Sequence, residues 1–349
     1  MTLIGKMIGV GERLPIPDKI ARAVIASFVG RTARKMCAAE SDADRAFAEA
    51  MAAYPIAVNV DAANAQHYEL PQEFFALVLG PQRKYSCCLY NNDADSLIEA
   101  EERALAATAE HAGLADGQRV LDLGCGWGAL SLWMARRYRA ANIVAVSNSH
   151  SQRAFIGNVA RAAALSNLDV ITAGMNGFVP SGRFDRVVSV EMFEHMANWR
   201  PLLWRMRDCL NPDGRMFMHV FSNAHAPYRF RADDEDDWIA QHYFTGGVMP
   251  SHDLIRQFGD CFAVEAHWRW NGRHYARTAA DWLANFDRNA AAIRSILKKV
   301  YGRDAPLWQR RWRLFFLATI GLFGHADGNE WGVSHYRLSP VSADAAVSG

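Results

Sequence analysis

The chain has 349 residues, of which 50% are hydrophobic and 21% are charged, and this composition excludes an intrinsically disordered protein. Its 38 lysines and arginines nearly balance its 37 aspartates and glutamates, so the net charge of +1 gives no global attraction to nucleic acid. We therefore expect no nucleic-acid partner. The length predicts one large domain with an accessory lobe.

Residues 1–110 are predicted to form a helical region that covers the functional pocket as a lid. Asp42–Ala53 is rich in alanine and has helical periodicity, and apolar residues recur at helical spacing in Glu69–Leu79. Ser96–His111 opens with a serine and has Glu99 three residues later, which is the pattern of a capping box.

Residues 111–338 are predicted to form an α/β domain, because short apolar strands alternate there with helices. This alternation predicts a doubly wound, mostly parallel, Rossmann-like sheet of seven strands. The strands are predicted at Arg119–Leu123, Asn142–Ser147, Asp169–Ala173, Phe184–Val190, Arg215–Val220, Phe262–Trp270 and Trp331–Leu338. Helices are predicted at Ala129–Tyr138, Ser149–Leu165 and Trp199–Leu210, and a turn is predicted at Asn211–Gly214.

Two segments interrupt this alternation and are predicted to form an inserted substrate lobe, namely residues 221–250, with the acidic run Asp233–Asp237, and residues 278–324. The apolar run Leu314–Gly324 is about half of the ~20 residues that a membrane-spanning helix needs, so we expect a buried helix. The arginines just before it allow peripheral contact with anionic lipid, although a solvated helix end is the simpler interpretation. Residues 339–349 are predicted to be a polar tail.

The six cysteines argue against a metal site and against disulfides. They are Cys37, Cys87, Cys88, Cys125, Cys209 and Cys261, and none forms a CxxC pair. We therefore expect no zinc, and a reducing, cytoplasmic compartment. The oligomeric state stays open at this point, with a dimer as one alternative.

The most informative segment is the glycine-rich loop Asp122–Gly128, which follows a predicted strand and precedes a predicted helix. Gly124 and Gly126 allow the backbone to approach a ligand, and the helix N-terminus attracts negative groups. The DxGxGxG spacing resembles the first motif of class I methyltransferases that use S-adenosylmethionine (SAM), in which this loop lies along the methionine part. The simpler alternative is a tight turn that Asp122 caps.

The end of the second predicted strand departs from the general methyltransferase pattern. Many such enzymes carry an acidic residue there for the ribose hydroxyls, whereas this chain has Ser147 and Asn148, with Gln152 one turn later. Neutral hydroxyl and amide groups would then hydrogen-bond the nucleoside.

Several motifs together resemble the cyclopropane fatty acid synthase family, which includes the mycolic acid cyclopropane synthases, and especially its coclaurine N-methyltransferase branch. They lie between residues 67 and 335. The motifs are HYELP (67–71), KYSCC (84–88), DLGCGWGAL (122–130), SNSHSQRAF (147–155), EMFEHMAN (191–198), DEDDW (234–238), GRHYART (272–278) and NEWGVSH (329–335).

The resemblance implies site residues of two kinds. Those expected to contact SAM are Tyr85, Ser86, Gly124, Gly126, Ser147 and Gln152. In the cyclopropane synthases a bicarbonate ion takes a proton beside the methyl group, and its ligands match Cys87, Glu194, His219 and Tyr275, with a backbone contact at an isoleucine that is Phe221 here. In the N-methyltransferases the acceptor amine is handled by residues that match Glu191, Glu194 and His195, and phenylalanine replaces Tyr275.

Without the family resemblance, the residue types indicate these roles less strongly. Glu191 and Glu194 are three residues apart, so they share a face if the segment is helical, and both follow a predicted strand at its C-terminal end. By itself His219 is a hydrogen-bonded core histidine, and Cys87 is a small buried residue. Trp238, Phe244 and Trp331 are candidates to line the acceptor pocket, and each of them alone fits an ordinary core position as well.

Three functions remain open from the sequence. The first is methylation of the double bond of an unsaturated fatty acyl chain, which yields a cyclopropane or methyl-branched lipid after proton loss to a base. The second is N-methylation of a hydrophobic amine, and the third is a non-enzymatic binder that keeps the fold. We predict a SAM-dependent methyltransferase of lipid biosynthesis with the acyl chain as acceptor, and the amine as the alternative.

Overall fold

The computed structural model describes residue 12 and residues 16–58, 70–233 and 237–341. Two pieces of the motifs named above, residues 67–69 and 234–236, lie outside the described residues.

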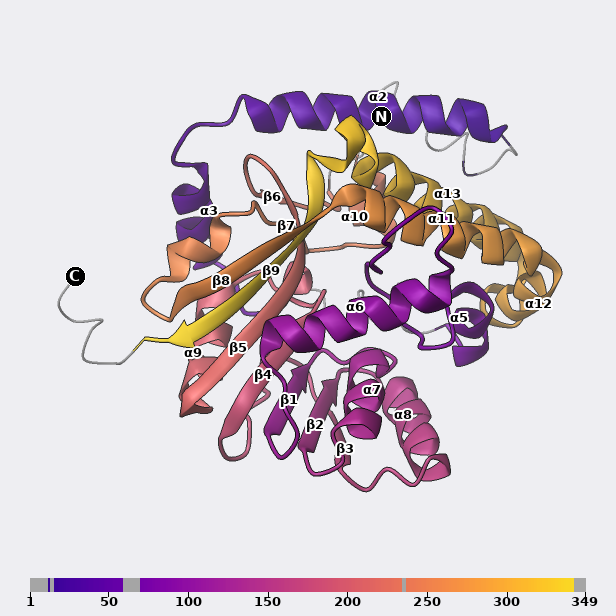
Figure 1. Ribbon diagram of the computed structural model, residues 1–349. Coiled ribbons are helices and arrows are strands. Elements are labelled where there is room, and N and C mark those ends of the chain that lie inside the picture. The colour runs from indigo at the N-terminus through magenta and orange to yellow at the C-terminus, as the bar shows by residue number, and fades with distance from the viewer. Residues whose placement is uncertain (1–11, 13–15, 59–69, 234–236, 342–349) are drawn as a thin grey trace.

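A seven-stranded sheet forms the centre of the molecule, with strand order β3-β2-β1-β4-β5-β9-β8 (Figure 1). The first five strands in this order are parallel, and β9 runs antiparallel to both of its neighbours, β5 and β8. The doubly wound, mostly parallel sheet is therefore confirmed. The strands are β1 (Arg119–Leu123), β2 (Asn142–Ser147), β3 (Leu168–Thr172), β4 (Phe184–Val190), β5 (Leu210–Asn223), β8 (Phe262–Asn271) and β9 (Trp331–Pro340).

The strand order adds to the sequence prediction, and one predicted turn differs from it. The strand that comes last in the chain, β9, lies inside the sheet, and β8 takes the edge. The predicted turn at Asn211–Gly214 falls within β5, where the pairing with β4 shifts from Leu210 directly to Arg215. An irregularity in one long strand thus replaces a loop between a helix and a strand.

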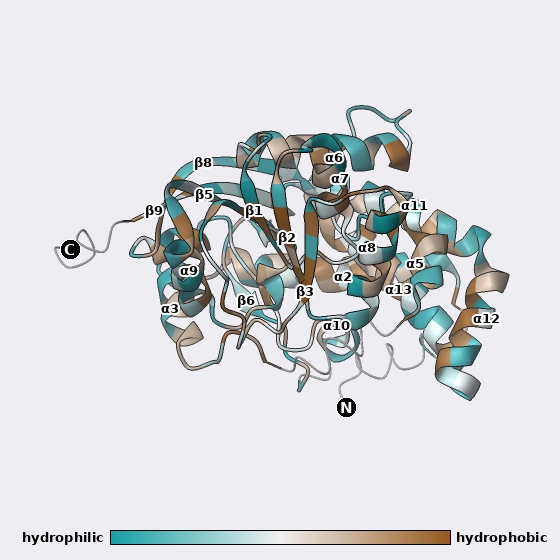
Figure 2. Ribbon diagram, turned by 90° about the horizontal axis from the view of Figure 1, so that it is seen from below, coloured by the Kyte–Doolittle hydropathy of each residue, from teal (hydrophilic) through white to brown (hydrophobic). Residues whose placement is uncertain are grey.

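Helices cover both faces of the sheet. One face carries α6 (Leu97–Ala112), α7 (Ala129–Arg137) and α8 (His150–Ala162), and the other carries α3 (Ala43–Met51), α9 (Trp199–Asp208) and η2 (Leu254–Phe258). The predicted capping box of α6 is present, because the Ser96 side chain accepts from the Glu99 backbone N–H and the Glu99 side chain accepts from the Ser96 N–H. Figure 2 shows hydrophobic stretches on β2 and β3 and a mixed pattern on outer helices such as α12.

A helical lobe packs beyond the carboxyl ends of the parallel strands (Figure 1). It contains α2 (Asp18–Cys37), α5 (Gln72–Val78), α11 (Gly272–Arg288), α12 (Ala290–Tyr301), η3 (Gly302–Asp304), α13 (Ala305–Phe323) and η4 (His325–Gly328). Its core is strongly aromatic and includes Phe74, Phe75, Trp282, Phe286, Trp312 and Phe316. Shorter elements, β6 (Tyr228–Arg229), α10 (Trp238–His242) and β7 (Val248–Met249), join this lobe to β5.

Strand β8 passes into α11 with no intervening loop, and Gly272 makes this junction possible. A Cβ atom at this position would lie 2.1 Å from the carbonyl oxygen of Trp331 and 2.3 Å from that of Phe323. Only glycine fits such a close approach of three backbone segments. The junction therefore fixes α11 directly against β9 and α13.

The arginines at the start of α13 form contacts within the protein. Arg311 forms an ion pair with Glu12 at 2.9 Å, and Arg313 pairs with both Asp18 and Asp287. Within the described part of the chain, no helix combines the length and apolarity needed to cross a membrane.

Candidate active site

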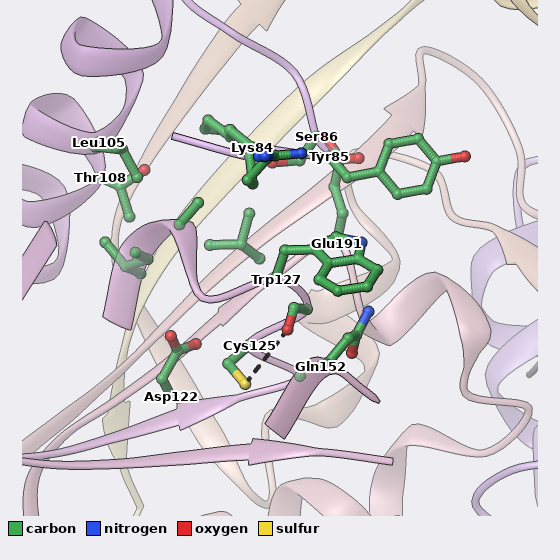
Figure 3. A pocket seen from close by; sticks show the side chains of 16 residues that line it. Lys84, Tyr85, Ser86, Leu105, Thr108, Asp122, Cys125, Trp127, Gln152 and Glu191 are labelled. Carbon is green, nitrogen blue, oxygen red and sulfur yellow. Dashed lines mark hydrogen bonds between the residues drawn. The ribbon is translucent and has the colours of Figure 1, made fainter. Parts of the chain in front are cut away.

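A pocket opens at the carboxyl ends of β1 and β4, where the glycine-rich loop enters α7. Figure 3 shows Lys84, Tyr85 and Ser86 on one side of it and Asp122, Cys125 and Gln152 on the other. Six of the eight predicted cofactor residues line this pocket, which are Tyr85, Ser86, Asp122, Gly124, Gly126 and Gln152. Ser147 and Asn148 do not line it.

The two central glycines of the loop have positive φ angles, +84° for Gly124 and +52° for Gly126. A Cβ atom on Gly124 would lie 2.4 Å from the Met192 side chain, whereas a Cβ atom on Gly126 would meet nothing within 4 Å. Gly124 is therefore required for packing, while Gly126 leaves free space at the pocket wall.

Asp122 is buried below the loop, and its carboxylate accepts a hydrogen bond from the Ser131 hydroxyl at the start of α7. Burial raises the pKa of Asp122 to about 6, against the lowering effect of this hydrogen bond. The aspartate thus joins the end of β1 to the first turn of α7 through the Ser131 hydroxyl and holds the loop in place, whereas the start of α7 has no side-chain capping hydrogen bond from the described residues.

Gln152 presents a free donor to the pocket, and Ser147 orients it. The Ser147 hydroxyl donates to Gln152 Oε1 at 2.6 Å. The Gln152 side chain is 1% exposed, and its Nε2 has no partner among the described residues. A buried amide donor without a partner is costly, so this group fits a ligand that supplies an acceptor. Ser147 therefore acts through Gln152.

Glu191 lies at the centre of the acid–base residues, directly after β4, with a φ angle of +47°. Its Oε1 accepts from the Cys87 backbone N–H at 2.9 Å and lies 3.1 Å from His219 Nε2. Its Oε2 accepts from the Tyr275 hydroxyl at 2.6 Å. Burial raises the pKa of Glu191, while Lys84 and the hydrogen bonds from Cys87 and Tyr275 lower it.

Glu194 is fully buried in the short helix η1 (Phe193–His195), and its two carboxyl oxygens differ. Oε1 accepts from the Phe221 backbone N–H at 2.6 Å, whereas Oε2 has no partner in the described parts of the chain. Burial, together with the charge of Glu191, raises the pKa of Glu194 far above its usual range. Because η1 begins only at Phe193, Glu191 and Glu194 do not share a helical face as the spacing alone allowed.

Aromatic rings connect Tyr275 to His195. Tyr275 stacks on Phe323 with ring centroids 4.3 Å apart, and Phe323 lies 6.2 Å from Phe221. Phe221 lies 5.5 Å from Phe244, whose ring stacks on His195 at 4.8 Å and 11°. Of the predicted acceptor residues, Phe244 thus lies beside the acid–base residues.

The two predicted tryptophans lie in the core of the helical lobe. Trp238 donates from Nε1 to the Glu12 carboxylate, and Trp331 is fully buried with its ring edge towards His325. Their positions match the core interpretation that the sequence left open.

A family model described as mycolic acid cyclopropane synthetase matches residues 58–323, well over half of the chain. The chain belongs to the mycolic acid cyclopropane synthetase family. It is 36% identical over 285 residues to (S)-coclaurine N-methyltransferase of Thalictrum flavum subsp. glaucum, and the match covers 80% of this chain and 79% of that one. It is 30% identical over 274 residues to cyclopropane-fatty-acyl-phospholipid synthase of Escherichia coli (strain K12), covering 78% and 67%.

A solved structure of coclaurine N-methyltransferase bound to N-methylheliamine and SAH has a TM-score of 0.93 to this member of the synthetase family. The two are 29% identical, and the superposition covers 97% of this chain and 100% of that chain. The protein is a SAM-dependent methyltransferase, and SAM is its cofactor. The open wall at Gly126 and the free Gln152 donor fit a ligand with the polar groups of SAM.

Sequence reasoning did not single out two buried polar side chains beside the candidate site of this family member. Lys84 is 3% exposed, and its Nζ donates to Ser86 Oγ at 2.5 Å and to the Cys87 carbonyl at 2.6 Å, so it is a buried cation close to Glu191. His335 on β9 lies 2.9 Å from His219 Nδ1. Both stand inside motifs that carried the resemblance, but their roles depend on contacts that no local pattern reveals.

Away from the pocket, Cys37, His225 and Glu330 offer atoms that could hold a metal ion. Cys37 Sγ lies 3.2 Å from His225 Nε2, which is 3.1 Å from a Glu330 oxygen. The three side chains lie at distances typical of hydrogen bonds and ion pairs with one another. The structure does not test whether a metal ion binds there, so the absence of a metal site stays a prediction.

Proposed function

We propose that this methyltransferase transfers the methyl group to the nitrogen of a hydrophobic amine. The observation that carries this proposal is the difference between its two buried carboxyl groups. Glu191 accepts from the Cys87 N–H and the Tyr275 hydroxyl and lies 3.1 Å from His219 Nε2, whereas Glu194 keeps one buried oxygen without a partner among the described residues. An amine can supply both the proton that Glu191 takes and the donor that Glu194 lacks, whereas an alkene supplies no hydrogen-bond donor.

The groups expected to bind bicarbonate contact carboxyl groups of the protein itself. The Cys87 N–H, His219 and Tyr275 all contact the Glu191 carboxylate, and the Phe221 N–H donates to Glu194. These are the groups that the family resemblance assigned to the bicarbonate ion. Because each donor already has a carboxylate partner, the site carries its own base and has no need of a free anion.

The need for a base follows from the chemistry of amines. An alkylamine with a pKa of about 10.4 is mostly protonated at neutral pH, and its nucleophilic form costs about 4–5 kcal/mol there. Glu194 pairs with the incoming ammonium, and the proton then passes to Glu191, whose orientation His219 and Tyr275 fix. When bound, SAM supplies an electrophilic methyl group.

Aromatic rings lie near these carboxyl groups, which supports a hydrophobic acceptor. Phe221, Phe244 and His195 stand beside Glu194, and ring faces attract cations by about 0.5–2 kcal/mol each. The similarity to coclaurine N-methyltransferase, whose solved structure holds N-methylheliamine, supports the same choice. The acyl acceptor, which the sequence placed first, has less support because the groups expected to bind bicarbonate already contact carboxyl groups.

A split assay tests the proposal. The purified enzyme receives SAM with a labelled methyl group and either a benzylisoquinoline-type amine or vesicles of unsaturated phospholipid. We expect label in the amine, with no change when bicarbonate is removed. Label in the lipid that disappears without bicarbonate would overturn the proposal and return the acceptor to the acyl class.

A further inference from the structure

We propose that Glu191, His219, His335 and His111 form a proton relay that connects the active site to the surface at the end of α6. The proposed function enters only as the source of the proton, which is the nitrogen of the acceptor amine. His335 and His111 have no part in binding the cofactor or the acceptor in the site described above.

The contacts form an unbroken chain. His219 Nε2 lies 3.1 Å from Glu191 Oε1, and His219 Nδ1 lies 2.9 Å from His335 Nε2. His335 Nδ1 then lies 2.8 Å from His111 Nδ1. In each of the two buried rings one nitrogen contacts the preceding group and the other nitrogen contacts the next group. An imidazole in this arrangement can accept a proton on one nitrogen and donate a proton from the other.

The sheet register creates this chain. His219 on β5 and His335 on β9 are directly paired residues of neighbouring strands. Because the His335 ring contacts both His219 and His111 of α6, these side chains lie on the face of the sheet that α6 covers. His111 lies in the last turn of α6 and stacks on Trp268 of β8 with ring centroids 4.0 Å apart. The relay thus starts directly after β4, crosses β5 and β9 and ends on a helix.

Apolar rings enclose the middle of the relay. The His335 ring lies 4.3 Å from Trp270 and 5.2 Å from Phe217, and both His219 and His335 are fully buried, whereas His111 is partly exposed. The chain therefore has a dry interior, a carboxylate at one end and access to solvent at the other.

Burial and the cations around the relay favour neutral histidines, against the opposite effect of the nearby carboxylates. Glu191 and Lys84 face His219, and Glu110 and Arg337 lie near His111. Burial, with Lys84 and His111, lowers the pKa of His219, and burial, with His219, His111 and Lys84, lowers the pKa of His335. A neutral ring has one donor and one acceptor nitrogen, which is the state that a relay requires.

The transfer balances as one concerted shift. The proton on Glu191 moves to His219 Nε2, the Nδ1 proton of His219 moves to His335 Nε2, and the Nδ1 proton of His335 moves to His111 Nδ1. The Nε2 proton of His111 then leaves to water. Each ring gains one proton and loses one, so all three histidines stay neutral and one proton leaves the site.

The first test uses the resting enzyme without an acceptor, so it does not depend on the proposed function. Glu191→Gln places an amide beside His219, and the ¹⁵N signals of His111 should move although two rings separate the residues. In a His335→Gln background, where the amide keeps hydrogen bonds but cannot relay, Glu191→Gln should leave His111 unmoved. An unmoved His111 in the single variant, or a shift that persists in the His335→Gln background, would overturn the relay.

The second test measures turnover with the amine that the split assay identifies. In weak buffer His111→Ala should lower kcat by about three- to tenfold, and added imidazole should restore it, because a small base can replace a proton carrier at the surface. His267→Ala, an exposed histidine on β8 outside the chain, is the matched control and should respond to neither change. Full activity of His111→Ala in weak buffer would overturn proton transport, whereas failure to methylate any amine would count against the proposed function alone.

Discussion

The cofactor pocket and the acid–base residues differ in how their polar groups are satisfied. Gln152 keeps an amide donor without a partner among the described residues, while Glu191, which lines the same pocket, already accepts hydrogen bonds from the Cys87 N–H and the Tyr275 hydroxyl. The pocket is thus arranged to gain contacts on binding, and the base is arranged before any ligand arrives. Substitutions in the two regions should therefore separate cofactor binding from turnover.

The sharpest test of this separation is Glu191→Gln. We expect kcat to fall by about 10²–10⁴, the usual contribution of a general base, with SAM affinity unchanged. Calorimetry for SAM and the labelled-methyl assay give the two readouts. Glu265→Gln, which alters an ion pair on β8, is the control, and an equal loss of SAM affinity in Glu191→Gln would contradict the separation.

Asp122→Asn measures how much the burial of this carboxyl group changes the free energy of unfolding. The pKa of Asp122 is raised to about 6 from 3.8, so the folded state binds the proton more tightly than the unfolded chain. Its contribution to stability therefore falls as pH rises from about 4 to about 6, by about 3 kcal/mol in total. The free energy of unfolding of Asp122→Asn relative to the wild type should rise by this amount over that interval in urea titrations. A difference that does not depend on pH would refute the raised pKa.

Gly126→Ala should weaken SAM binding, because the added methyl group takes up the free space at the pocket wall, and we expect an approximately tenfold weaker Kd for SAM. The positive φ separately destabilises the folded state by about 1–2 kcal/mol, with or without SAM. Calorimetry measures the Kd, and the melting temperature monitors the fold. Gly177→Ala, which also has an open surrounding but lies outside the pocket, should leave the Kd unchanged.

The smallest effect is expected at the acceptor side. Phe244→Leu removes the ring that stacks on His195 and should raise KM for the amine by about threefold to tenfold, since such ring contacts contribute about 0.5–1.5 kcal/mol. The Kd for SAM should not change. A fall in kcat with an unchanged KM would instead mean that this ring contributes to methyl transfer and not to acceptor binding.

The sequence predicts the parts of the molecule that are local along the chain. The glycine loop, the strand before it and the α6 capping box each occupy a few consecutive residues, so periodicity and spacing suffice. The position of Gln152 can also be predicted from the sequence, because it lies in the first turn of the helix that follows β2.

The acid–base residues are harder to predict because they come from distant segments. Cys87 meets Glu191 across 104 residues, and Tyr275 meets it across 84. The left-handed backbone of Glu191 also turns its side chain away from the helical face that its spacing with Glu194 suggested. The pairing of His219 with His335 depends on strand register, which alternation within one strand does not determine.

The position of β9 has a consequence for how the protein is made. Because this strand inserts between β5 and β8, the sheet cannot close until residues 331–340 have left the ribosome. Until then β5 and β8 each expose an unpaired edge next to aromatic side chains, and such edges pair with other chains. The pairing of β9 therefore both completes the sheet and covers these edges, and a chain truncated before Trp331 should accumulate as insoluble protein.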